Sequence, residues 1–148
     1  MYVGEICAQG DNIMVGYYKN QNATRQAIVD DWLHTGDMGY VDKDDFFYIT
    51  GRKKNVIISG GVNIYPEEIE EVLISNDNVV DAYVYGVEDL LLGEVVYAKI
   101  VIKEPMRIED LKEYCLCLLG ASKTARGFIV CSQIEKTPTG KILRNCTQ

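Results

Sequence analysis

The chain has 148 residues, of which 47% are hydrophobic and 25% charged, so it has the composition of an ordinary soluble protein with a core of modest size. Its net charge of −7 argues against a nucleic-acid binder, which needs a basic face for phosphates, and against docking on anionic lipid. The longest apolar stretches are only a few residues, so we expect no membrane span.

The first fifty residues are predicted to form short strands and turns. They carry three basic and eight acidic side chains, and the more balanced charge of the remainder indicates that two different pieces join near residue 50. Aromatic and β-branched residues predict a strand at Phe46–Ile49, whereas residues 23–33 have only a weak helical pattern. We expect no independent core here.

The second part of the chain has a clearer pattern of elements. Pro66 suits the first position of a helix, and Ile69, Val72 and Leu73 form one apolar helical face. A second apolar face is predicted between Ile108 and Leu119. Strands are predicted at residues 56–58, 79–87, 95–102 and 128–130. The order of helices and strands predicts an α+β domain of about a hundred residues.

The cysteines and the single histidine limit the metal chemistry that we expect. No cysteine pair has CxxC spacing and His34 is the only histidine, so a zinc site is improbable and we predict no metal site. Five cysteines without a disulfide framework predict reduced thiols in a cytoplasmic protein: Cys7, Cys115, Cys117, Cys131 and Cys146. Because the first residues have neither a basic nor an apolar region, we expect no signal peptide.

Two motifs of the first part carry candidate chemistry. In His34-Thr35-Gly36-Asp37, the carboxylate in a turn can accept hydrogen bonds from vicinal hydroxyls such as those of a ribose, or can simply cap its own turn. Gly51-Arg52-Lys53-Lys54-Asn55 offers a guanidinium fork and two ammonium groups to a phosphate, or is a solvated turn.

Two further motifs lie in the second part. The paired glycines of Ser59-Gly60-Gly61-Val62-Asn63 allow positive φ or a close approach of backbone to a ligand, or form a plain turn. Thr137-Pro138-Thr139-Gly140-Lys141 carries a lysine that can bring positive charge to a phosphate or carboxylate, although a surface turn has the same appearance. No phosphate-binding P-loop occurs in the chain.

The order of these motifs resembles the C-terminal end of the adenylate-forming superfamily, which contains acyl-CoA synthetases, peptide-synthetase adenylation domains and luciferases. The resemblance covers nearly the whole chain and is closest to the acyl- and aryl-CoA ligases. It rests on Gly4-Glu5-Ile6, Trp32–Asp37, Gly51–Lys54, Gly60–Glu70, Gly93-Glu94 and Thr139–Ile142.

The resemblance implies a fold and an activity. It implies a small lid domain at residues 54–148, with a three-stranded sheet flanked by helices, after a β-rich remnant of a large AMP-binding domain at residues 1–53. Members of the superfamily join a carboxylate to ATP, with Mg²⁺, to form acyl-AMP. A thiol, usually that of CoA, then displaces AMP. The lid domain turns between the two half-reactions and presents a different face in each.

The resemblance also implies a role for six residues. By matching positions, Lys141 is the catalytic lysine that bridges the carboxylate and the α-phosphate during adenylation. Asp37 binds the ribose hydroxyls, and Arg52 lies near the ribose and phosphates. Lys54 is the hinge, and the pair Gly60-Gly61 lines the tunnel for the pantetheine arm.

The phosphate loop, the adenine-contacting segment and the acyl pocket of the superfamily all lie upstream of Gly4. We therefore expect a C-terminal fragment, a split-gene product or a truncated chain, which is inactive alone and has the large N-terminal domain as its partner. Two alternatives remain open. The chain is a non-catalytic interaction module that docks or dimerises through exposed apolar surface, or it is the lid of an adenylation domain that loads a carrier protein instead of CoA.

Overall fold

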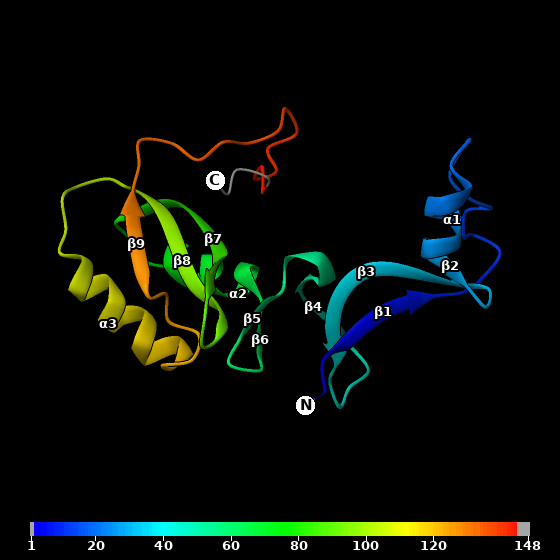
Figure 1. Ribbon diagram of the computed structural model, residues 1–148, viewed down its shortest axis with the longest axis horizontal. Helices are drawn as coiled ribbons and strands as arrows, with labels where there is room; N and C mark the ends of the chain where they lie inside the picture. Colours follow the sequence, from blue (N-terminus) through cyan, green and yellow to red (C-terminus); the bar gives the residue numbers. More distant parts are fainter. Residues whose placement is uncertain (1, 145–148) are drawn as a thin grey trace. The chain divides into compact units, whose positions relative to one another are not determined.

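The computed structural model describes residues 2–144 and divides the chain into two compact units, Met1–Lys54 and Asn55–Gln148 (Figure 1). The division falls one residue after the boundary expected from the sequence. The assignment of the first unit to a larger AMP-binding domain stays a prediction.

The first unit is an antiparallel sheet centred on one long strand, β3, which pairs with three shorter strands. One short helix, α1, precedes β2 in the chain. The elements of this unit are β1 (Gly4–Ala8), α1 (Gln21–Ala27), β2 (Ile28–Val29), β3 (Trp32–Val41) and β4 (Phe47–Arg52). The short helical turn η1 (Lys53–Asn55) follows.

The weak helical pattern over residues 23–33 is correct only at its start. The side chain of Asn20 caps α1 by accepting a hydrogen bond from the amide of Ala23. The helix stops at Ala27 because β2 turns back to pair with β3 through Asp30 and Asp31, whose φ angles are 50° and 65°. Aspartate tolerates this left-handed region better than most residues, so the pair can form the turn.

The second unit contains a five-stranded mixed sheet and two helices. Its strands run in the order β6-β5-β8-β7, and β9 pairs with β8 in parallel. The elements are β5 (Ile57–Ser59), β6 (Val62–Ile64), α2 (Pro66–Ile74), β7 (Val79–Asp89), β8 (Gly93–Ile102), α3 (Ile108–Leu119) and β9 (Gly127–Val130).

The mixed helix-and-strand fold expected from the sequence is confirmed, but the strand count is not. The expected three-stranded sheet corresponds to β7, β8 and β9, and the hairpin β5–β6 extends it through one pair, Ser59 with Gly93. The hairpin has only three residues in each strand, so the sequence pattern indicated a single short strand followed by a turn.

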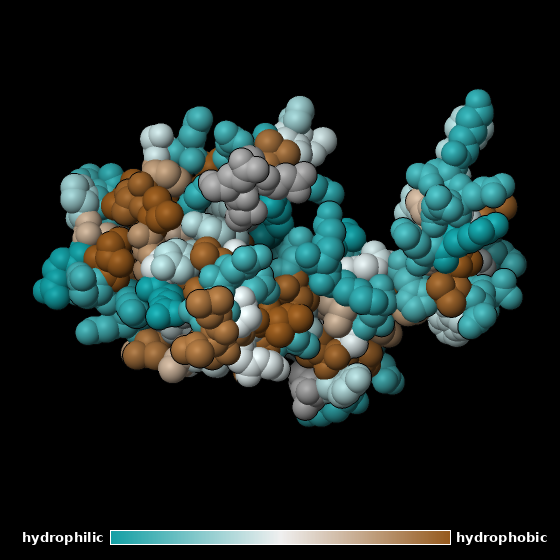
Figure 2. Space-filling model, in the orientation of Figure 1, coloured by the Kyte–Doolittle hydropathy of each residue, from teal (hydrophilic) through white to brown (hydrophobic). Residues whose placement is uncertain are grey.

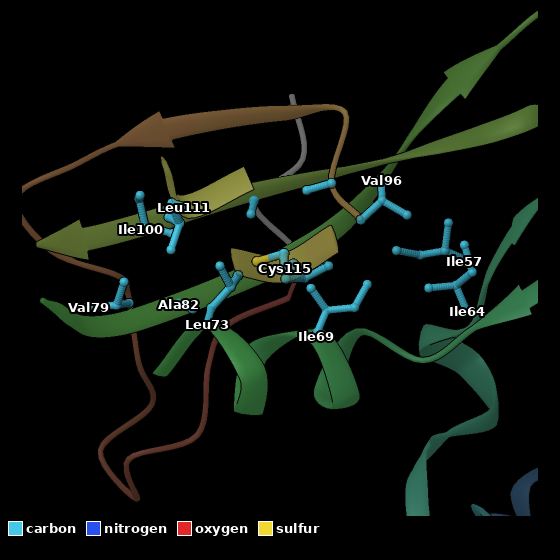
Figure 3. Packing of buried hydrophobic residues seen from close by; sticks show 13 residues of the cluster. Ile57, Ile64, Ile69, Leu73, Val79, Ala82, Val96, Ile100, Leu111 and Cys115 are labelled. Carbon is cyan, nitrogen blue, oxygen red and sulfur yellow. The ribbon is translucent and has the colours of Figure 1, made fainter. Parts of the chain in front are cut away.

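Both helices pack on the same face of this sheet. Alternate residues of the two long strands, including Ala82 on β7 and Ala98 and Ile100 on β8, form one core cluster with apolar residues of α2 and α3 (Figure 3). Leu73 and Leu111, from α2 and α3, are fully buried. Burial of each such side chain stabilises the fold by about 1.5–3 kcal/mol. None of the helices in the described part is long and apolar enough to cross a membrane.

Large apolar side chains also remain on the surface of both units, where Figure 2 shows them as brown patches. In the second unit, Leu90 and Leu91 at the β7–β8 turn are fully exposed. In the first unit, the exposed residues include Phe46, Phe47 and Ile49 on and beside β4. Both units therefore present apolar surface that another molecule or another part of a larger protein can cover.

Candidate functional site

Asp37 and Arg52, two of the predicted site residues, form an ion pair with one another. They are opposite one another in the register between β3 and β4. Arg52 Nε lies 2.8 Å from Asp37 Oδ1, and Arg52 Nη1 donates to the carbonyl of Thr35 at 3.3 Å. The arginine side chain is half exposed and the aspartate is partly exposed. A carboxylate and a guanidinium are thus available side by side on one sheet.

The backbone before Asp37 is shaped by a register shift between β1 and β3. Gly36 has a φ of 73°, a left-handed conformation that favours glycine. The hydroxyl of Thr35 donates to the carbonyl of Ile6 at 2.7 Å and accepts from the amide of Asp37 at 3.1 Å. The hydroxyl of Thr35 therefore fixes the position of the Asp37 backbone, while the Asp37 carboxylate pairs with Arg52. The binding of a ribose by Asp37 stays a prediction.

Glu5 is the centre of a polar network beside this turn. One of its oxygens lies 3.0 Å from His34 Nδ1 and 2.8 Å from Lys53 Nζ, and the other accepts from the amide of Gly36 at 3.2 Å. The hydrogen bond from His34, followed by the one from Lys53, lowers the pKa of Glu5 to about 2. Glu5 is therefore ionised at neutral pH and ties β1 to β3 and to the segment after β4.

The same network contains a group of potential metal ligands that the sequence spacing did not reveal. Ligand atoms of Glu5, Cys7 and His34 lie within 4.8 Å of one another. Glu5 and Cys7 are two apart on β1, and Cys7 is opposite His34 in the register, so strand pairing brings the three together. The Glu5 carboxylate already has Lys53 and His34 as partners.

A cavity of about 550 Å³ lies beside these residues within the first unit. It is lined by Tyr17, the end of α1, the Thr35-Gly36 turn, Arg52 and both lysines that follow it. Its wall also includes Glu5, which pairs with Lys53, and Arg52 pairs with Asp37, so the cavity is lined by charges of both signs.

Lys54, the predicted hinge, is the last residue of the first unit. It is exposed and lies within the short helical turn η1, which begins directly after β4. Among the described residues, none forms a hydrogen bond or an ion pair with its side chain, which lines the cavity of the first unit. Its place is thus the boundary between the two units, and its role as a hinge stays a prediction.

Gly60 and Gly61 form the two-residue turn of the β5–β6 hairpin. Their φ values of 55° and 81° are both positive, as a type I′ hairpin turn requires. A Cβ on Gly60 would lie 3.3 Å from a methyl group of Leu92, whereas a Cβ on Gly61 would meet nothing within 4 Å. Within this unit Gly61 therefore faces open space, and its glycine is required by the backbone conformation.

A groove of about 680 Å³ in the second unit begins beside this turn. Ser59 and Leu92 line one end, and the segment after α3 lines another part of it. The wall includes two cations, Lys112 and Arg126, and Arg126 donates to Asp89 at 2.9 Å. The groove thus combines an apolar wall with the ammonium group of Lys112 and the ion pair of Arg126 with Asp89.

Lys141 is exposed at the end of a closed turn near the C-terminus. The amide of Thr137 donates to the carbonyl of Lys141 at 2.7 Å, and the amide of Gly140 donates to the carbonyl of Thr137 at 2.8 Å. The amide of Lys141 also donates to the hydroxyl of Thr137 at 3.1 Å. These bonds, with a bridge between Lys136 and Ile142, make the segment a small hairpin rather than a free tail.

The contacts that hold this hairpin were missed from the sequence. Lys136 pairs with Asp81 on β7, and Arg144 pairs with Glu70 on α2 at 2.8 Å. Glu70 is the only buried charged residue among those described, and burial raises its pKa while Arg144 opposes that rise. A sequence signal existed only for Glu70, an acidic residue in a helix between apolar positions.

The six predicted residues therefore fall into separate places. Asp37 and Arg52 are in direct contact within the first unit, and Lys54 ends that unit. In the second unit, the Gly60-Gly61 turn lies beside Leu92, whereas the turn of Lys141 is held by α2 and β7.

Comparison with known proteins identifies the family. The model of the AMP-binding enzyme C-terminal domain matches residues 68–141, which is half of the chain and includes Lys141. The chain belongs to this family. A sulfoacetate–CoA ligase from Cupriavidus necator is 44% identical over 145 residues, which cover 96% of this chain and 28% of the ligase.

Solved structures of adenylate-forming enzymes have the same fold. The o-succinylbenzoate CoA synthetase of Bacillus subtilis, in complex with the acyl-adenylate intermediate OSB-AMP, is 38% identical with a TM-score of 0.93. That match covers 98% of this chain and 30% of the synthetase. The same synthetase bound to ATP and a magnesium ion gives a TM-score of 0.92, at the same identity and coverage. The chain thus spans under a third of the length of these relatives.

Proposed function

We propose that this chain is the C-terminal part of an ATP-dependent acyl- or aryl-CoA ligase. The observation that carries the proposal is the match to the B. subtilis synthetase, a CoA ligase with bound acyl-adenylate, over 98% of this chain. The reaction has two steps. A carboxylate attacks the α-phosphate of ATP and releases pyrophosphate, and the thiol of CoA then attacks the acyl carbonyl and releases AMP.

In the first step, Lys141 is the residue that stabilises the developing charge. As the carboxylate approaches the α-phosphate, negative charge builds on the phosphoryl oxygens, and a fixed ammonium group offsets it. The hydrogen-bonded turn of Lys141 supports this role because it limits where the ammonium group can be. Asp37 binds the ribose hydroxyls, and Arg52, held beside it, meets the ribose and phosphates.

In the second step, the Gly60-Gly61 turn allows the pantetheine arm to approach. The open space beside Gly61 supports this role, since a side chain there would enter the path of a narrow thiol-bearing arm. The adjoining groove supports CoA as the thiol because Lys112 in its wall can meet a phosphate of the CoA nucleotide. Lys54, at the unit boundary, is the hinge that exchanges the two faces.

The test joins the full chain to a large domain. In the B. subtilis synthetase, the matching C-terminal part is replaced by this chain, and single-turnover rates of adenylation and of thioester formation from supplied acyl-AMP are measured. Lys141→Ala should slow adenylation by on the order of 100-fold or more and leave thioester formation nearly intact. Equal loss in both half-reactions would contradict the assignment.

Gly61→Leu should have the opposite effect and slow thioester formation alone. Its matched control is Gly61→Ala, which experiences the same backbone strain at positive φ but adds only one carbon atom. If both variants lose the same activity, the glycine is needed for its backbone conformation and the approach path lies elsewhere.

A further inference from the structure

β7 is an edge strand, and at Val84 two side chains bind the backbone groups that face away from the sheet. The amide of Val84 donates to Glu70 Oε1 at 2.8 Å, and its carbonyl accepts from Arg144 Nη1 at 3.4 Å. Glu70 Oε2 in turn accepts from Arg144 Nη2 at 2.8 Å. Glu70 and Arg144 thus form a closed ring of hydrogen bonds with the amide and the carbonyl of one residue, Val84, where a further strand would otherwise pair.

Arg144 is held from several sides at this point. Besides Glu70, its Nη2 lies 3.3 Å from Glu67 Oε1, and its guanidinium lies 5.8 Å from the ring centre of Tyr83. The hydroxyl of Tyr83 also donates to the backbone carbonyl of Arg144 at 3.3 Å. The side chain of Arg144 is only 21% exposed. Both its side chain and its backbone are therefore fixed to the second unit.

This fixed point is three residues from Lys141, within the same small hairpin. Leu143 donates its amide to the carbonyl of Glu135 at 3.0 Å, and Thr137 donates to Lys141, so the two arms move together. The other arm is tied to β7 by the ion pair of Lys136 with Asp81. Of the two anchors the one at Arg144 is the more buried, since 40% of the Lys136 side chain is exposed.

We propose that Arg144 is a positioning residue that holds the turn of Lys141 in the place that adenylation requires. The catalytic part of this proposal rests on the role of Lys141 proposed above. The anchoring of the hairpin by Arg144 is independent of that role. A misplacement of about 1 Å can cost on the order of 100-fold in rate when a reacting group must meet its partner in one geometry. Loss of this anchor should therefore act on the one step that uses Lys141.

An arginine suits this position better than a lysine. The planar guanidinium donates to Glu70 and to the Val84 carbonyl while it lies 3.3 Å from Glu67 Oε1, whereas an ammonium group on a flexible stem cannot keep all three contacts in a fixed geometry. Arg144→Lys should accordingly restore only part of the function that Arg144→Ala removes.

The first experiment measures amide hydrogen exchange in the full chain by itself. Arg144→Ala, combined with Glu70→Gln so that no unpaired charge stays buried, should raise exchange at the amides of Thr137, Gly140 and Lys141 at least 10-fold. The amides of Ala98 and Ile100 in β8 should change little. Arg107→Ala is the matched control, since it removes another arginine ion pair, with Asp110, far along the chain from the hairpin. Unchanged protection of the hairpin in the double variant would overturn the proposal.

The second experiment uses the B. subtilis synthetase in which this chain replaces the matching C-terminal part. Arg144→Ala should slow adenylation by about 10- to 100-fold through kcat, with KM for ATP nearly unchanged and thioester formation within about 2-fold. Arg144→Lys should recover part of the loss, and Arg107→Ala should lose nothing. Equal loss in both half-reactions would assign Arg144 to stability alone.

The two proposals can fail separately. If Lys141→Ala does not affect adenylation, the proposed function fails, and the exchange experiment still decides whether Arg144 holds the hairpin. If Lys141→Ala abolishes adenylation but Arg144→Ala leaves it intact, the positioning role is wrong and the proposed function stands.

Discussion

The two units of the chain are held together in different ways. The second unit has a contiguous apolar core to which its long strands and both helices contribute (Figure 3). In the first unit, Gly39 and Gly51 are the only fully buried residues among those described, and aromatic side chains of β4 are exposed. Its sheet is instead tied by polar contacts, above all those of Glu5 and the ion pair of Asp37 with Arg52.

The difference shows what each unit needs in order to fold. An apolar core supplies most of the stability of a small domain, whereas half-exposed ion pairs each contribute little. The second unit therefore has what independent folding requires. The first unit has the character of a sheet that becomes stable when its apolar side chains are covered, as they would be within a larger domain.

The largest expected effect comes from separating the units. A chain that begins at Lys54 should unfold in one cooperative thermal transition, because all the residues of the apolar core are retained. Residues 1–53 alone should show no cooperative transition. Circular dichroism melts of both pieces check this expectation, and a molten or insoluble product from the Lys54 chain would show that the first unit supplies part of the core.

The second-largest difference between the units is expected in the loss of stability on side-chain truncation. Leu73→Ala in α2, at a fully buried position, should lower the free energy of unfolding by about 2–5 kcal/mol. Ile49→Ala in β4, where the side chain is 68% exposed, should change it by about 0.5 kcal/mol or less. Denaturant titration of the full chain measures both, and similar losses at the two positions would contradict the comparison.

Acid should act on the polar network of the first unit. The pKa of Glu5 is about 2 in the folded chain and 4.5 without its partners, so its contribution is complete above pH 4.5 and is lost as the pH falls towards 2. Trp32, the single tryptophan, lies in β3 and reports on this unit by fluorescence. The acid transition seen by Trp32 should fall in this window. Glu5→Gln should be less stable than the parent at pH 7 and equally stable near pH 2, and a constant difference across this range would refute the role of Glu5.

The smallest effect concerns two thiols of α3. Cys115 is buried in the core, which raises its pKa to about 11, whereas Cys117 is exposed. A maleimide at pH 7 should label Cys117 within minutes and leave Cys115 unmodified until the second unit unfolds. Peptide mass mapping locates the label, and rapid labelling of Cys115 in the native chain would contradict the packing of α3. Cys146 lies outside the described residues.

Much of the secondary structure of the second unit was predictable because the residues that indicate each element are close together in the sequence. Pro66, two glutamates in the first turn and the spacing of Ile69 and Leu73 are enough to locate α2 within one residue. The hairpin strand β6 was missed because three residues give too short a pattern. The turn of Asp30 and Asp31 was missed because it depends on the pairing of β2 with β3, which is visible only in the folded chain.

The sequence motifs proposed the residues of the candidate site but could not predict the contacts that hold them. The motifs identified Asp37, Arg52 and Lys141, yet the partners that fix them come from distant strands and helices. Arg144 meets Glu70 across 74 residues of sequence, and Glu5 meets Lys53 across 48. Pairing at such separations follows from strand register and helix packing, for which a single sequence carries no local pattern.

The parallel pairing of β9 with β8 determines when, during synthesis, the edge of β8 is protected from self-association. β9 covers the edge of β8 at Tyr97–Ile100, but it is synthesised after β8 and α3. Until residues 127–130 leave the ribosome, this apolar edge offers unpaired amides and carbonyls to the edge of any other nascent chain. Chains that end at Arg126, which keep α3 but lack β9, should therefore form more inclusion bodies than chains that extend past Val130.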